Sequence, residues 1–231
     1  MSYLNRYIQQ MSHLKRYFLI SSCIILACSV SNAQQDPAAE QYLQAVSDQF
    51  RMDEGYMIRM DYIREDQMRD TYAEGEGTIW MKGVKYKVIL DEYIVYYDGQ
   101  KLYSQNTEAG EVYVSTPDPD DPGYFQAVPI RIIKSYQSDF KYQYMGRNAF
   151  MGKDRIEVRL YPKAPSGPYS MLSLFLNPNT LKLEGTRLKH KEGIQYTMIL
   201  SEVEGGHAYP DEMFAFDPEA YPGTEVIELI E

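Results

Sequence analysis

Beyond residue 33, the residues with the chemistry for catalysis or metal binding are two histidines and several pairs of neighbouring acids. His190 lies at the end of a charged stretch and His207 follows two glycines, and neither has a Glu or second His at the spacing of a metal site. Two carboxylates that face each other across a cleft could catalyse hydrolysis as a general acid and a general base. The neighbouring acids of this chain, however, fall at predicted turns, where carboxylates are normally solvated. Examples are the acidic pairs that begin at Asp53, Asp91, Asp120 and Asp211.

Two further patterns resemble functional motifs only in part. Asp118, Asp120 and Asp121 could contribute to a calcium loop, but they lack the spacing and the glycine of an EF-hand. Gly75 and Gly77 lack the third glycine of a phosphate-binding loop and open a predicted strand instead of a helix. The sequence also contains no G-x-S-x-G motif. We therefore predict no catalytic residue, no metal and no cofactor, and an exported carboxylate-based hydrolase is the least favoured alternative.

The first 33 residues resemble a secretory signal peptide, with the start at Met1 or at Met11. Two basic residues precede an apolar run over 17–28, and small residues at Ser31 and Ala33 fit a cleavage site. The apolar run is shorter than the ~20 residues of a membrane-spanning helix. The sequence thus predicts an exported protein with a signal peptide over 1–33, a mature N-terminus near Gln34 and one domain over 34–231.

Both cysteines, Cys23 and Cys28, lie inside the predicted signal peptide. Cleavage after Ala33 would leave no cysteine, and hence no disulfide and no thiolate site. A second interpretation stays open, because Ile25-Leu26-Ala27-Cys28 partly resembles a lipobox. In that case Cys28 would be the lipidated first residue of an anchored protein.

The charge of the chain disfavours two classes of partner. Its net charge is −10, and three basic residues but no acid precede residue 34, which leaves 20 basic against 33 acidic residues and a net charge of −13 beyond that point. A field of this sign repels phosphate backbones and anionic lipid surfaces. We expect no nucleic-acid partner and no adsorption to membranes by charge.

Hydrophobic periodicity predicts helices in two places. Asp36 and Pro37 form a helix start, and apolar residues at helical spacing follow to about Met52, with Gly55 ending the helix. Prolines and aspartates over 116–123 exclude regular structure there. A short helix is then expected from Pro129 to about 138.

Most of the remaining chain alternates with a period of two and is divided by turn residues every eight to twelve positions. Asp98-Gly99 is the strongest hairpin signal. The segment 170–176 is apolar on both faces and should be covered on both sides. These patterns predict a mainly β, meandering antiparallel sheet in one domain.

The order of several motifs makes the chain resemble the LolA-type outer-membrane lipoprotein carriers of Gram-negative bacteria. After the N-terminal helix come GEGTIWMK at 75–82, KYKV at 85–88, YDGQKLY at 97–103 and EVYV at 111–114. The helix at Pro129 follows, then LYPK at 160–163, MFAF at 213–216 and PGTEVI at 222–227. The chain departs from the family at Tyr103, where a Trp is frequent, and at Gly83, where some members carry an Arg associated with transfer to a receptor.

The resemblance implies an unclosed antiparallel β half-barrel with a few helices covering its concave face. An apolar cavity between them would hold the acyl chains of lipoproteins, accepted from an inner-membrane ABC-type transporter and carried through the periplasm to an outer-membrane acceptor that we leave unassigned. We expect a monomer. Two alternatives remain, a related receptor anchored at the outer membrane through Cys28 and an envelope sensor.

Period two in the strands and the stripe after Pro129 indicate which side chains should form this site. The side chains expected to line the cavity are Tyr56, Ile58, Met60, Tyr86, Val88, Leu172, Leu174, Leu176, Met198 and Leu200. A lid over the cavity is expected from Ile130 and Ile133.

Overall fold

The computed structural model describes residues 35–118, 120, 130–164 and 166–229. The predicted signal peptide, its two cysteines and the expected mature N-terminus lie outside the described residues. So does Pro129, and of Ile130 only the backbone is described.

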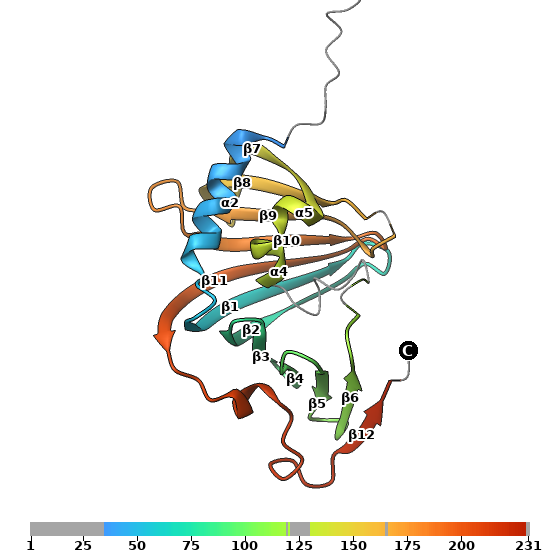
Figure 1. Cartoon of the computed structure of the whole chain (residues 1–231). Coiled ribbons are helices and arrows are strands. Elements are labelled where there is room, and N and C mark those ends of the chain that lie inside the picture. The colour runs from blue at the N-terminus through green and yellow to red at the C-terminus, as the bar shows by residue number, and fades with distance from the viewer. Residues whose placement is uncertain (1–34, 119, 121–129, 165, 230–231) are drawn as a thin grey trace, which may run out of the picture. The chain divides into compact units, whose positions relative to one another are not determined.

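Twelve strands form one sheet, in the order β12-β6-β5-β4-β3-β2-β1-β11-β10-β9-β8-β7 (Figure 1). All neighbours pair antiparallel except β12 and β6, which pair parallel. In the described part of the chain β12 and β7 are not neighbours, so the sheet stays unclosed and the predicted fold class is confirmed. The strands are β1 Gly55–Asp66, β2 Thr71–Lys82, β3 Lys85–Leu90, β4 Tyr93–Tyr97, β5 Leu102–Asn106, β6 Glu111–Ser115, β7 Phe140–Phe150, β8 Lys153–Pro162, β9 Tyr169–Leu176, β10 Leu183–His190, β11 Ile194–His207 and β12 Glu225–Glu228.

Three helices lie on one face of this sheet, over the half formed by β7 to β11 (Figure 1). They are α2 Pro37–Gln49, α4 Ile130–Lys134 and α5 Tyr136–Asp139; a 3-10 helix, η1 Asp211–Phe214, follows β11. None of the helices in the described residues has the length and apolarity of a membrane span.

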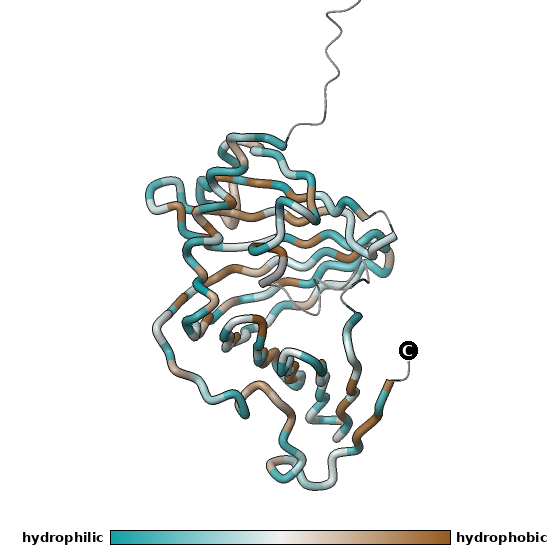
Figure 2. Tube along the Cα trace, viewed as in Figure 1, coloured by the Kyte–Doolittle hydropathy of each residue, from teal (hydrophilic) through white to brown (hydrophobic). Residues whose placement is uncertain are grey.

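Both predicted helices are shorter than expected. The first ends at Gln49 because Phe50 has extended backbone angles, and Gly55 begins β1 instead of ending the helix. The second is interrupted at Ser135, whose φ of −123° and ψ of 22° are not helical, so two short helices replace one. Figure 2 shows apolar and polar residues alternating along the strands, as the period of two predicts.

The start of α2 protects the edge of the sheet at β7. Asp36 accepts a hydrogen bond from the backbone N–H of Ala38 at 2.9 Å and another from Tyr144 of β7 at 2.8 Å. The Gln35 side chain donates to the carbonyl oxygen of Phe140 at 2.8 Å. Side chains thus satisfy backbone groups that an open edge would offer to another chain.

The main core lies between the helices and the concave face of the sheet. The buried stripe of α2, formed by Ala39, Leu43 and Val46, packs in one cluster with Val158 and Leu174. This stripe removes an apolar face of the helix from water, which is what holds a helix of this length in place.

A second, smaller cluster lies on the opposite face, under the segment that follows η1. Ile94 and Tyr96 alternate along β4 with Val95 and Tyr97, which belong to the main cluster, so their side chains point to the other face. There they pack with Phe216.

The strand β9 is covered on both faces, as its sequence predicts. Leu172, Leu174 and Leu176 belong to the main core. On the other face the Phe175 ring stacks on Phe150, with ring centroids 4.0 Å apart and an angle of 13° between the planes.

Candidate ligand cavity

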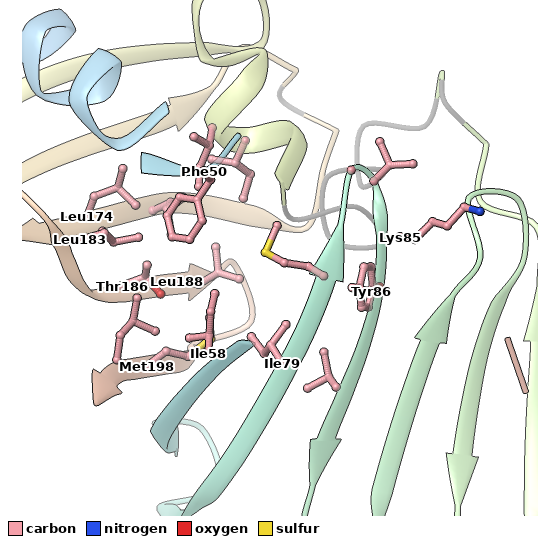
Figure 3. Close-up of a pocket in the computed structure, with 18 of the residues that line it drawn as sticks. Phe50, Ile58, Ile79, Lys85, Tyr86, Leu174, Leu183, Thr186, Leu188 and Met198 are labelled. Carbon is pink, nitrogen blue, oxygen red and sulfur yellow. The ribbon is translucent and has the colours of Figure 1, made fainter. Parts of the chain in front are cut away.

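A cavity of about 300 Å³ lies between the concave face of the sheet and α4. Strands β1, β2, β3, β9, β10 and β11 supply its walls, and Phe50, just after α2, points into it (Figure 3). On the outside the cavity reaches the surface at the turn between β2 and β3, where the lining residue Val84 is 40% exposed. The sheet thus forms a trough that the helices cover only in part.

The lining is almost entirely aliphatic and aromatic. Its polar side chains are Lys85 at the rim, Thr186 in the wall and the two tyrosines Tyr86 and Tyr169. Burial raises the pKa of Tyr86 and of Tyr169, so both phenols stay neutral at physiological pH. A cavity with this lining suits an apolar chain and offers nothing to a charged one except at its rim.

Most of the side chains expected to form the site lie together around this cavity. The lining includes Ile58, Tyr86, Val88, Leu172, Leu174, Met198 and Leu200 from the predicted wall, and Ile133 from the predicted lid.

Three other predicted wall residues are buried beside the cavity instead of lining it. Tyr56 lies under Phe50, with ring centroids 5.4 Å apart, and its hydroxyl accepts from the backbone N–H of Arg51 at 2.8 Å. Met60 is 3% exposed and Leu176 is fully buried. The sequence pattern placed these three on the apolar side of their strands, but it does not show which side chains other packing would cover.

The lining also contains residues that the sequence analysis missed. Ile79 and Met81 alternate with polar or outward positions along β2, so the period-two pattern could have found them. Phe50 and Leu183 are brought in by packing between distant segments, for which the sequence carries no local signal. The missed lining residues are Phe50, Ile79, Met81, Gly83, Val84, Lys85, Ile132, Tyr169, Leu183, Thr186 and Leu188.

The helix α4 is tethered to α2 by polar contacts outside the cavity. The Lys134 ammonium donates to the carbonyl oxygen of Ser47 at 2.7 Å, near the C-terminal end of α2. The next helix, α5, is joined to α2 as well, since the Gln137 amide donates to Glu40 at 2.7 Å. A cation at the C-terminal end of a helix is favoured by the helix dipole, so these contacts hold Ile132 and Ile133 over the trough.

The acids and histidines lie away from the cavity. Among the described residues no three His, Cys, Asp or Glu side chains come together as a metal site. Asp118 accepts from the backbone N–H of Asp120 at 2.9 Å, whereas Asp121 lies outside the described part. Gly75 of the 75–77 motif leaves room for a neighbouring side chain, because a Cβ at this position would lie 2.8 Å from the Tyr62 ring.

The buried acids are not those of the predicted pairs. Glu157 is 4% exposed and accepts from Ser173 at 3.0 Å, Asn148 at 2.9 Å and Arg159 at 2.6 Å. It alternates along β8 with core residues and therefore lies on the face opposite the cavity. Its carboxylate is satisfied by these partners and has a structural role.

No family model matches the sequence, and no curated protein matches it. Among solved structures the chain is similar to an uncharacterized conserved protein from Thermus thermophilus, with 6% identity, a TM-score of 0.52, and coverage of 83% of this chain and 99% of that one. It thus shares the fold over nearly the whole of that protein.

Two further structures have lower TM-scores. A LolA superfamily protein from Nitrosomonas europaea is 12% identical, with a TM-score of 0.41 and coverage of 77% of this chain and 97% of that one. A domain described as an outer membrane lipoprotein-sorting protein, from Vibrio parahaemolyticus, is 9% identical, with a TM-score of 0.41 and coverage of 76% and 97%. A LolA superfamily protein is thus among the solved structures to which this chain is similar.

Proposed function

We propose that this chain is an exported, non-enzymatic carrier that shields an acyl chain of a lipoprotein in the cavity beneath α4. The observation that carries the proposal is the apolar lining of a cavity that stays unfilled by the protein's own side chains. Protein interiors are normally packed without such voids, so an apolar cavity of about 300 Å³ indicates a site for an apolar ligand.

The energetics of the cavity suit transfer between membranes. If a methylene takes up roughly the ~30 Å³ that a water molecule occupies in the liquid, the cavity holds about ten methylenes. Each methylene gains about 0.8 kcal/mol on leaving water, whether it enters a protein or a bilayer. A chain can therefore pass between a membrane and the cavity with little net change in free energy, as a carrier requires.

Helix α4 is the cover of the cavity, and it would take part in loading and release. Ile132 and Ile133 face the same apolar space that the cargo would fill. Contacts of α4 with the sheet then compete with contacts to cargo, and the balance between them sets the occupancy. Lipoproteins with more than one acyl chain need more room than about ten methylenes, so α4 would have to move to admit them.

The proposal places the chain in the periplasm, between an inner-membrane ABC-type transporter that supplies acylated lipoproteins and an outer-membrane acceptor. Mass spectrometry of the mature protein tests the export step. A free N-terminus at Gln34 supports a soluble carrier over 34–231, whereas a diacylated Cys28 supports an anchored receptor.

The binding step is tested with a fluorescent acyl chain and its transfer to liposomes. The change Ile133→Asp should reduce binding and transfer at least tenfold, because a carboxylate would enter an apolar site. The matched control is Ile199→Asp, since Ile199 lies between Met198 and Leu200 on β11 but points to the other face.

The outcomes separate the parts of the proposal. If the unaltered protein fails to bind the acyl probe, the carrier function is wrong. If the protein binds it and Ile133→Asp binds and transfers equally well, α4 is not the cover. Equal losses in both variants would trace the effect to general instability, and the thermal unfolding of each variant identifies that case.

A further inference from the structure

Two lysines flank the turn at which the cavity reaches the surface. Lys82 ends β2 and Lys85 begins β3, with Gly83 and Val84 between them. Both ammonium groups bind the same carboxylate of η1, Lys85 at 2.8 Å and Lys82 at 3.2 Å from Asp211. Two positive charges thus share one negative charge at this rim, in a chain with a large excess of acids.

Lys85 is placed where the polar end of a bound amphiphile would emerge, and Lys82 lies beside it on the same carboxylate. The Lys85 side chain contributes to the lining, while its amine is directed away from the apolar residues (Figure 3). Val84, between the lysines, is exposed and also lines the cavity. An acyl chain that fills the trough from this side would leave its headgroup within reach of flexible lysine side chains.

The carboxylate that the two lysines share is replaceable, and Lys82 also donates to the carbonyl oxygen of Tyr209 at 3.0 Å. The Asp211 side chain is 59% exposed, and those of Lys82 and Lys85 are 40% and 29% exposed. Hydrogen bonds from Lys85 and Lys82 keep the pKa of Asp211 below its usual value, so it is a carboxylate at neutral pH. Exposed ion pairs of this kind are weak, and a second anion can compete for the same two cations.

We propose that Lys82 and Lys85 form a headgroup subsite for an anionic single-chain lipid, and that Asp211 occupies it when the cavity is empty. The shared chemistry is an acyl chain bearing a negative group, either the carboxylate of a fatty acid or the phosphate of a lysophospholipid. This inference rests on the acyl-binding cavity proposed above. It adds anionic single-chain lipids as a class of ligand. The acyl chains of a lipoprotein differ from these, because their ester and amide linkages carry no charge.

The test compares three probes with the same fluorescent acyl chain, a free fatty acid, a lysophosphatidate and a neutral monoacylglycerol. Binding is measured at physiological ionic strength with the mature protein and with Lys82→Gln/Lys85→Gln. We expect the double variant to bind the anionic probes about three- to tenfold more weakly and the neutral probe unchanged. Asp211→Asn should bind the anionic probes more tightly, because it removes the competing carboxylate.

The matched control is Lys153→Gln, which removes the same charge from the exposed start of β8. In the sheet β8 lies five strands from β2, and neighbouring strands are about 4.8 Å apart. Charges more than about 8 Å away are largely screened at this ionic strength, so this variant should bind all three probes as the unaltered protein does.

Each outcome bears on one conclusion. A loss confined to the fatty acid, or to the lysophosphatidate, supports the subsite and identifies its ligand as the carboxylate or the phosphate lipid. If the neutral probe binds and the double variant weakens all three probes equally or none, the headgroup subsite is wrong while the acyl cavity stands. If no probe binds the unaltered protein, the acyl cavity is wrong and the subsite falls with it.

Discussion

Asp36 joins the first helix to the edge of the sheet through its two carboxylate oxygens. The hydrogen bond from Tyr144, with those from Ala38 and Ala39, keeps the pKa of Asp36 below the ordinary 3.8. A folded pKa below the unfolded one stabilises the protein above pH 3.8, and this contribution is lost as the pH falls toward the folded value. The sequence predicted the helix cap, but the link to β7 depends on a residue 108 positions away.

We therefore expect Asp36→Ala to lower the free energy of unfolding by about 1–2 kcal/mol at pH 7. The loss should shrink as the pH falls below about 4, since the protonated side chain of the unaltered protein no longer accepts both bonds. Urea unfolding at pH 7 and pH 3 measures the difference. Asp48→Ala, at the other end of α2, is the control, and an Asp36 effect independent of pH would contradict the assignment.

Gly185 on β10 makes room for the ring of Phe150. A Cβ at this position would lie 2.3 Å from that ring and 2.8 Å from the carbonyl oxygen of Met198. We expect Gly185→Ala to cost about 1–3 kcal/mol of stability, measured by denaturant unfolding. In a Phe150→Ala background the cost should fall, because the ring is gone. An equal cost in both backgrounds would show that the ring is not the cause.

At the scale of elements, hydrophobic periodicity predicts whether a segment is a helix or a strand better than it predicts where that segment begins and ends. The alternation along β3 and the hairpin at Asp98-Gly99 were confirmed, since side chains that face one core must alternate. Helix ends were less accurate. The first helix ends at Phe50, whose ring packs on Tyr56 of the sheet, and the second breaks at Ser135, for which the sequence gives no local signal. Sequence spacing also could not show that Leu176 is fully buried in the core while Leu174 lines the cavity.

The tether between α4 and α2 predicts how tightly the cover is held. Lys134 binds the carbonyl oxygen and the hydroxyl of Ser47, at 2.7 and 3.2 Å. Removing this contact with Lys134→Ala should weaken the closed arrangement without changing the lining. We expect release of a bound acyl probe to liposomes to become about two- to fivefold faster, as for the loss of one exposed charged hydrogen bond.

Stopped-flow fluorescence measures this release. The control is Lys153→Ala, at the exposed start of β8, which removes the same charge without touching the contact between Lys134 and Ser47. Release at the rate of the unaltered protein in Lys134→Ala would show that the tether does not hold the cover.

At the scale of the whole molecule, the sheet depends on different partners on its two faces. The helices bury the concave face of β7 to β11, whereas the segment after η1 covers the opposite face of β4 to β6. The motif over 213–216 was visible in the sequence, but its partners were not, because they come from strands about a hundred residues earlier. Phe214 is fully buried, and Phe216 is 9% exposed.

This division predicts that stability is not uniform across the sheet. Phe216 lies 6.4 Å from the rings of Tyr96 and Tyr103 and 5.9 Å from that of Tyr221, measured between centroids. Phe216→Ala should remove these contacts and cost about 2–4 kcal/mol locally, somewhat less than in a fully enclosed core. Because β4 to β6 have few other partners on that face, their amides should exchange with solvent faster, while those of β8 to β10 keep their protection.

Hydrogen exchange read by mass spectrometry resolves these segments. Phe175→Ala is the matched control, because Phe175 stacks on Phe150 from the same face of the sheet at its other end. It should speed exchange in β8 to β10 and leave β4 to β6 protected. Since both changes remove one buried ring, equal destabilisation with separate patterns would show that the two ends of the sheet open independently. Identical patterns across all strands in both variants would instead show that the sheet unfolds as one cooperative unit.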